Sequence, residues 1–88
     1  MTDHYGLNVE IIENEFELAL TFIDMARTKY SMGKYAQGDR CLDHAAKAIT
    51  TAQDLLAKMD SFPSSLGDLG RHADTALKNL QNSRPTAA

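Results

Sequence analysis

Residues 9–30 read VEIIENEFELALTFIDMARTKY, and the spacing of the apolar residues in this stretch predicts a helix. The residues of the expected buried face alternate in steps of three and four positions, which keeps one side of a helix turned toward its neighbours. No glycine or proline lies between Asn8 and Gly33, so we expect one helix over residues 8–32, with Asn8 as its N-cap. This buried stripe is Val9, Ile12, Phe16, Ala19, Ile23, Ala26 and Tyr30.

Two further stripes with the same spacing follow, separated by turn signals. The first signal, at residues 31–34, contains Gly33, which suits the left-handed position after a helix. The second, at residues 60–63, ends in Pro63, which disfavours helical angles at the residue before it. We expect helices over residues 34–60 and 65–82, the last capped by Ser64 or Ser65. The stripes are Tyr35, Gly38, Leu42, Ala45, Ile49, Ala52, Leu56 and Met59, and then Leu66, Leu69, Ala73, Ala76 and Leu80.

These three helices predict the fold class. Short turns make sequential helices antiparallel neighbours, so the sequence predicts an all-α, up-down-up three-helix bundle with coiled-coil-like packing. We expect a single domain over residues 1–83 and a disordered tail over residues 84–88. The third helix would be about 27 Å long against about 35–40 Å for the other two. It is therefore too short to cover the whole helical hairpin.

Composition and charge exclude several classes of function. The apolar fraction of 43% and charged fraction of 24% are those of a folded domain rather than a disordered chain. A net charge of −3 disfavours a nucleic-acid partner, and no apolar run is long enough to predict a membrane span. A lone cysteine, Cys41, and a first segment without Lys or Arg fit a cytoplasmic protein without a signal peptide.

The first helix carries more apolar residues than its buried stripe needs. Ile11, Leu18, Phe22 and Met25 lie beside that stripe, and Leu20 lies on its other flank. Two interpretations stay open at this point. Packing against two other helices explains a wide apolar face; alternatively, some of Leu18, Phe22 and Met25 form a surface patch that binds a partner or a second copy of the chain.

Charge is divided unevenly along the hairpin. Residues 1–24 contain six acids and no base, whereas residues 25–47 contain five bases and two acids. The bases gather near the first turn, where they would accept an acidic peptide or a phosphate. The competing interpretation is that they match the helix dipole and form ordinary surface pairs. The candidate partner-binding residues are Leu18, Phe22, Met25, Arg27, Lys29, Lys34 and Arg40.

Residues 26–50 resemble a single tetratricopeptide-repeat hairpin. The resemblance lies in small residues at Ala26, Gly38 and Ala45 and in the aromatic residues Tyr30 and Tyr35 around the glycine turn. The chain continues without a proline near residue 50, where the repeat has one, and no second copy follows at a period of about 34 residues. The three-helix layout is also similar to the microtubule-interacting-and-transport domain. Both resemblances imply binding of a peptide or a helix of another protein.

No arrangement of residues in the sequence favours catalysis. Asp39, Cys41, Asp43 and His44 are close in sequence, but their spacing on a helix does not make them converge, and a zinc site needs about four convergent ligands. We therefore expect no enzyme activity, no metal site and no cofactor, with Cys41 half-buried and His44 in solvent.

The leading functional hypothesis is a small intracellular interaction module whose helical groove receives a partner helix or peptide. The alternative is a structural homodimer that pairs through the first helix, and a metal-binding or small-ligand-binding bundle ranks below both. We expect no nucleic-acid or membrane partner.

Overall fold

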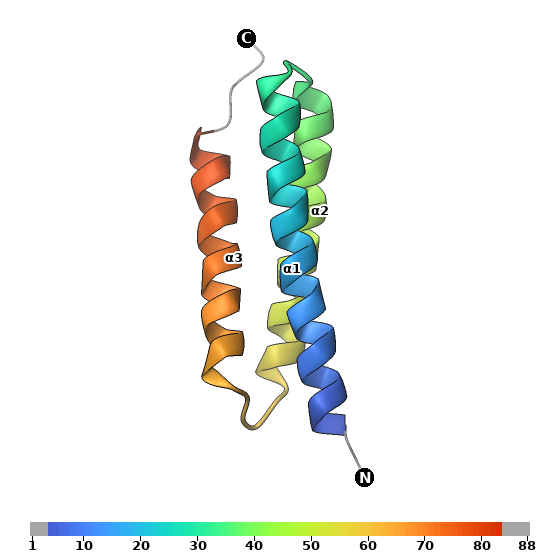
Figure 1. Ribbon diagram of the computed structural model, residues 1–88, viewed down its shortest axis with the longest axis vertical. Helices are drawn as coiled ribbons and strands as arrows, with labels where there is room; N and C mark the ends of the chain where they lie inside the picture. Colours follow the sequence, from blue (N-terminus) through green and yellow to red (C-terminus); the bar gives the residue numbers. More distant parts are fainter. Residues whose placement is uncertain (1–3, 84–88) are drawn as a thin grey trace.

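A computed structural model describes residues 4–83, with side chains described from Asn8 onward. It contains the three helices α1 (His4–Ser31), α2 (Tyr35–Ala57) and α3 (Ser64–Ser83). They run up, down and up beside one another, which confirms the predicted all-α three-helix bundle (Figure 1). The bundle is elongated, measuring 54 × 18 × 16 Å. Residues 84–88, predicted to form a tail, lie outside the described residues.

Each predicted helix boundary needs a small correction. α1 begins at His4, so Asn8 lies within the helix and does not cap it. α2 ends at Ala57, earlier than predicted, because the N–H groups of Lys58 and Met59 donate to carbonyls only three residues back, at 3.2 and 3.1 Å. That tighter bonding ends the α-helix before the proline does.

The helix α3 begins at Ser64 instead of at residue 65. Its first turn is closed by the N–H of Leu66, which donates to the carbonyl of Pro63 at 3.0 Å. Ser64 and Ser65 therefore lie inside the helix, and the prediction that one of them caps it is wrong. The backbone of Pro63 closes the turn instead, which suits a residue whose φ is already fixed near the helical value.

Gly33 makes the tight turn between α1 and α2, as predicted. Its φ of +77° is the left-handed conformation that side chains other than glycine disfavour. The N–H of Gly33 donates to the carbonyl of Tyr30 at 3.0 Å, and the N–H of Lys34 donates to the carbonyl of Lys29 at 2.8 Å. This pair of bonds is a Schellman motif, which satisfies the last carbonyls of α1 and sends the chain back along it.

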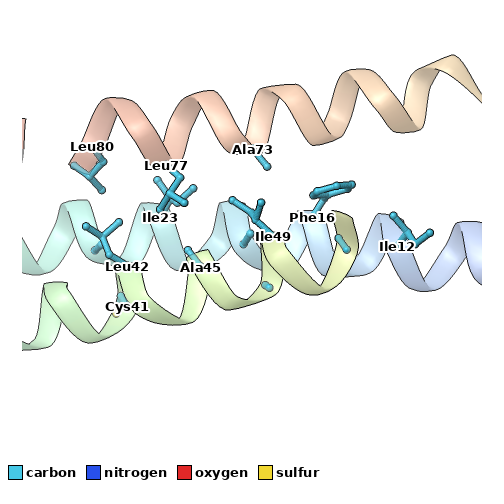
Figure 2. Packing of buried hydrophobic residues seen from close by; sticks show 14 of the residues in the cluster. Ile12, Phe16, Ile23, Cys41, Leu42, Ala45, Ile49, Ala73, Leu77 and Leu80 are labelled. Carbon is cyan, nitrogen blue, oxygen red and sulfur yellow. The ribbon is translucent and has the colours of Figure 1, made fainter. Parts of the chain in front are cut away.

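The core lies along the line where the three helices meet (Figure 2). Six of the seven α1 residues predicted for it are buried, and the seventh, Val9, is half-buried. On α2 the middle of the predicted stripe is buried, whereas Tyr35 is exposed and Leu56 is half-buried. Cys41, predicted as half-buried, is buried with 8% of its surface exposed.

The buried face of α3 is turned relative to the prediction. Leu69 and Ala76 are half-buried, and their neighbours Gly70 and Leu77 are buried in their place. The reason is Phe16 of α1, which has no exposed surface. A Cβ atom added to Gly70 would lie 2.8 Å from Cζ of Phe16. The glycine is therefore a packing residue that makes room for this ring, in addition to weakening the helix.

The position of α3 leaves part of the hairpin uncovered. The contact of Gly70 with Phe16 aligns the start of α3 with the first third of α1. Because α3 has 20 residues and α1 has 28, α3 ends below the α1–α2 turn, as Figure 1 shows. α3 packs mainly against α1 and less against α2. The α1–α2 hairpin is thus the main packing unit, and α3 lies along one side of it.

Candidate protein-interaction face

A line of large apolar side chains runs along the exposed side of α1. Leu18 and Met25 have 45% and 42% of their surface exposed, against 0% and 1% for the core residues Phe16 and Ile23. Each member of the line follows the previous one by seven residues, which places them on nearly the same side of a helix. We call this line the exposed stripe; it consists of Ile11, Leu18, Met25 and Met32.

The exposed stripe points away from α3. Phe16 contacts the position of Gly70 on α3, and Leu18 follows Phe16 by two residues. Two residues correspond to about 200° around a helix, so Leu18 lies on nearly the opposite side of α1. The stripe is therefore on the open side of the hairpin, and α3 does not cover it. The first interpretation of the wide apolar face, that the bundle buries all of it, is wrong for Leu18 and Met25.

Phe22 forms the edge of this face toward α2. It is half-buried and packs against the core cluster. Its ring stacks on the ring of His44 of α2, with 5.1 Å between centroids and 29° between planes. The sequence predicts that His44 lies in solvent, and it does not predict this stacking on Phe22. The stacking joins α1 and α2 on the open side, so the face extends from the exposed stripe across Phe22 to His44.

A shallow hollow lies beside Met25 on the same side of α1. It is lined by Thr21, Asp24, Met25, Thr28 and Lys29, all of which belong to this helix. Thr21 and Thr28 turn their hydroxyl groups back to the helix carbonyls of Glu17 and Asp24, at 3.1 and 3.2 Å. Their polar atoms are thereby hydrogen-bonded within the helix. Two small, uncharged side chains thus lie beside Met25, and the hollow between them has room for a side chain of a neighbouring molecule.

The cationic residues near the hairpin turn differ in whether they are paired. Arg27 is 3.1 Å from the carboxylate of Asp24. Within residues 8–83, no carboxylate lies within ion-pairing distance of Lys29, Lys34 or Arg40. Arg40 precedes His44 by one helical turn, so it lies on the same flank of α2. Three predicted partner-binding cations thus have no acidic partner in the described part of the chain.

The aromatic residues at the turn have a structural role. A Cβ atom on Gly38 would lie 2.5 Å from Cε1 of Tyr30, so α2 approaches this ring closely only because residue 38 is a glycine. The hydroxyl of Tyr30 donates to Oδ1 of Asp39 at 2.6 Å, and its ring lies 6.3 Å from that of Tyr35. Gly38 and Tyr30 thus pack closely beside the turn.

A metal centre finds no support in the described residues. Cys41 is a free, buried thiol, and His44 is exposed and stacked on Phe22. Across residues 8–83, no group of three or more His, Cys, Asp or Glu side chains is placed to hold an ion.

A second hollow, near the other end of the bundle, is a weaker candidate. It lies between the start of α3 and the body of the hairpin, beside the half-exposed ring of Phe62. Its charged groups are already paired, because Arg71 binds Asp68 and Lys78 lies 2.9 Å from Asp74. Unlike the face on α1, it offers no unpaired charge beside its apolar surface.

The structure adds two residues to those selected from the sequence. Ile11 and Met32 are 41% and 55% exposed and extend the line of Leu18 and Met25 in both directions. The N–H of Met32 still donates to the carbonyl of Thr28 at 3.1 Å, so Met32 keeps the helical register although α1 ends at Ser31. The signal that would have found both residues is the seven-residue spacing 11, 18, 25 and 32.

Comparison with protein-family models, with curated proteins and with solved structures found no match to this chain. The resemblance of residues 26–50 to a tetratricopeptide-repeat hairpin, and that of the whole layout to the microtubule-interacting-and-transport domain, therefore stay predictions. Among the described residues, no helix combines the length and the apolar character that crossing a membrane requires.

Proposed function

We propose that this chain is a protein–protein interaction module that binds an amphipathic helix along the open side of α1 and performs no catalysis. One observation carries the proposal: Leu18 and Met25 are exposed in line with Ile11 and Met32. A contiguous exposed apolar surface on a small protein marks an interaction site. A straight line of anchors at seven-residue spacing fits a helix laid alongside, as in helix-in-groove recognition.

The unpaired cations give the bound helix a direction. Lys29, Lys34 and Arg40 lie near the hairpin turn and have no acidic partner within residues 8–83. A partner helix with carboxylates at the end that lies over this turn would pair with them. Arg27 contributes less, because it is already 3.1 Å from Asp24. The partner is thus an amphipathic helix with one acidic end.

Two further observations support the proposal. The families that residues 26–50 and the three-helix layout resemble bind peptides or helices of other proteins. The lone cysteine, Cys41, is free and buried, which suits a reducing compartment. We accordingly place the module in the cytoplasm.

The test is selection from a displayed library of amphipathic helical peptides of about 25 residues. We expect the wild-type chain to enrich peptides with apolar residues seven positions apart and acids at one end. The double variant Leu18→Glu, Met25→Glu should lose this enrichment while keeping its helical circular dichroism. Thr75→Glu, at an exposed position of α3, is the control for added charge and should still enrich them. Equal enrichment by wild type and double variant would contradict the proposal.

A further inference from the structure

We infer that the helix bound on this face is α1 of a second copy of the chain, laid antiparallel to the first. This inference rests on the proposed function and names its partner. It follows from the distribution of charge beside the exposed stripe, from the symmetry of the stripe itself and from the area of the open face.

The charge on α1 is complementary to itself only in the antiparallel direction. Residues 10–24 of α1 contain Glu10, Glu13, Glu15, Glu17 and Asp24 and no base, whereas the cations Arg27 and Lys29 lie in its last turns. A second α1 that runs the opposite way places its acidic half over the basic end of the first. It is therefore a helix with one acidic end, as the unpaired cations require, and a parallel copy would place acid over acid.

The register follows from the spacing of the apolar residues. When the two-fold axis passes beside Phe22, residues whose numbers sum to about 44 face each other. Leu18 then lies next to Met25 of the partner copy, and Ile11 lies next to its Met32. Every member of the exposed stripe thus meets another member, which a closed two-fold interface requires.

The same register pairs charges along the edge toward α2. Glu15 and Lys29 are both half-buried on this edge, seven residues before and after Phe22. Neither has an ion-pair partner within residues 8–83. Across the axis Glu15 faces Lys29 of the partner copy, and the symmetry forms this pair twice. On the other edge Asp24 and Glu17 of the partner copy, whose numbers sum to 41, are about 4.5 Å along the axis from facing each other, and Arg27, 3.1 Å from Asp24, offsets their repulsion.

The open face is large enough for a stable dimer. A specific interface buries about 800 Å² on each partner. The exposed stripe runs along about 32 Å of helix from residue 11 to residue 32, and the molecule is 18 Å wide, so a second copy lying along α1 and the Phe22–His44 edge makes a contact of the same order. A chain of 88 residues buries a smaller share of its surface on folding than a larger domain does, so it gains from such pairing.

The experiment is the absolute mass by light scattering across about a hundredfold dilution, with a charge exchange at the predicted pair. We expect a dimer for the wild type and at least about tenfold weaker dimerisation for Glu15→Lys, because two attractive pairs become repulsive. The double variant Glu15→Lys, Lys29→Glu restores both pairs and should regain the wild-type dissociation constant. Residues 15 and 29 are about 21 Å apart along one helix, so only contact between copies produces this rescue.

Other outcomes overturn the inference in distinguishable ways. A wild-type monomer at every concentration overturns it and leaves the proposed function with a different partner helix. A dimer that Glu15→Lys leaves unchanged or strengthens shows that Glu15 does not face Lys29 of the partner copy, which also contradicts it. A dimer that survives Leu18→Glu, Met25→Glu lies elsewhere and overturns the inference and the proposed face together. Helical circular dichroism of each variant checks that the fold is intact.

Discussion

The two faces of α1 carry apolar side chains of similar size in opposite surroundings. The apolar residues of the buried face are spaced three and four positions apart, and they lie in the core, with Ile12, Phe16 and Ala19 at 0% exposure. The exposed stripe has steps of seven and keeps more than two fifths of each side chain in solvent. An extra apolar residue every seventh position is what a helix needs when it has a further neighbour. The difference separates the side chains that build the core from those that stay exposed.

The largest loss of stability should come from a substitution in the middle of the buried face. Replacing Phe16 by alanine removes a fully buried ring that α3 accommodates with Gly70. We expect a loss of about 3–5 kcal/mol of unfolding free energy, which is a large share of what a domain of this size has. Urea denaturation followed by circular dichroism measures it. A loss below about 1 kcal/mol would mean that Phe16 is not a core residue.

Overpacking the hairpin should have the next largest effect. Ala45 has no exposed surface and lies in the middle of α2, where small residues bring the two helices together. Ala45→Leu should destabilise the protein by about 1–3 kcal/mol, because the larger side chain forces the helices apart. Ala46→Leu, at the half-buried neighbouring position, is the matched control and should cost less. Equal stability of the Ala45→Leu variant and the wild type would refute close packing.

A smaller effect is expected where the buried face meets the turn. Gly38→Ala places a Cβ atom 2.5 Å from Cε1 of Tyr30, although alanine is the better helix former by about 1 kcal/mol. The tyrosine must move and release Asp39, so we expect a net loss of about 1 kcal/mol. Thermal unfolding of the double variant Gly38→Ala, Tyr30→Leu should recover part of it. A Gly38→Ala protein more stable than wild type would show that the Tyr30 ring can move aside at little cost in free energy.

The smallest effect on the fold should come from the exposed stripe. Leu18→Ala should change the unfolding free energy of the monomer by no more than about 0.5 kcal/mol, as at other surface positions. The measurement is urea denaturation at a protein concentration low enough to exclude association. A cost close to that of Phe16→Ala would mean that Leu18 is part of the core, and the distinction between the two faces would fail.

The sequence predicts the α1–α2 hairpin better than it predicts α3. On α1 the spacing of three and four positions between apolar residues defines one buried face. The other apolar residues, such as Leu18, lie too far around the helix to form an alternative buried face. On α3, Leu66, Ala73 and Leu80 fit two stripes equally well, one through Leu69 and Ala76 and the other through Gly70 and Leu77. The ring of Phe16 decides between them, and that contact joins residues distant in the sequence.

The candidate face was predicted in part. The surplus of apolar residues on α1 indicated Leu18, Phe22 and Met25, but the position of α3 was needed to find that Leu18 and Met25 stay exposed and that Phe22 packs against the core. The pairing of each cation depends on side-chain geometry that residue spacing does not give. Arg27 has Asp24 within reach one turn away, whereas no acid of the described chain reaches Lys29.

The buried thiol of Cys41 allows opening of the α1–α2 hairpin to be measured in the unmodified protein. A thiol with 8% of its surface exposed reacts with a soluble alkylating reagent only after the hairpin around it opens. As the chain has no other cysteine, the alkylation rate under native conditions follows one site without any labelling mutation. At high reagent concentration that rate is the opening rate, and at low concentration it gives the free energy of the opening. Kinetic traces of the unmodified chain would therefore tell whether α1 and α2 separate locally or only when the whole bundle unfolds.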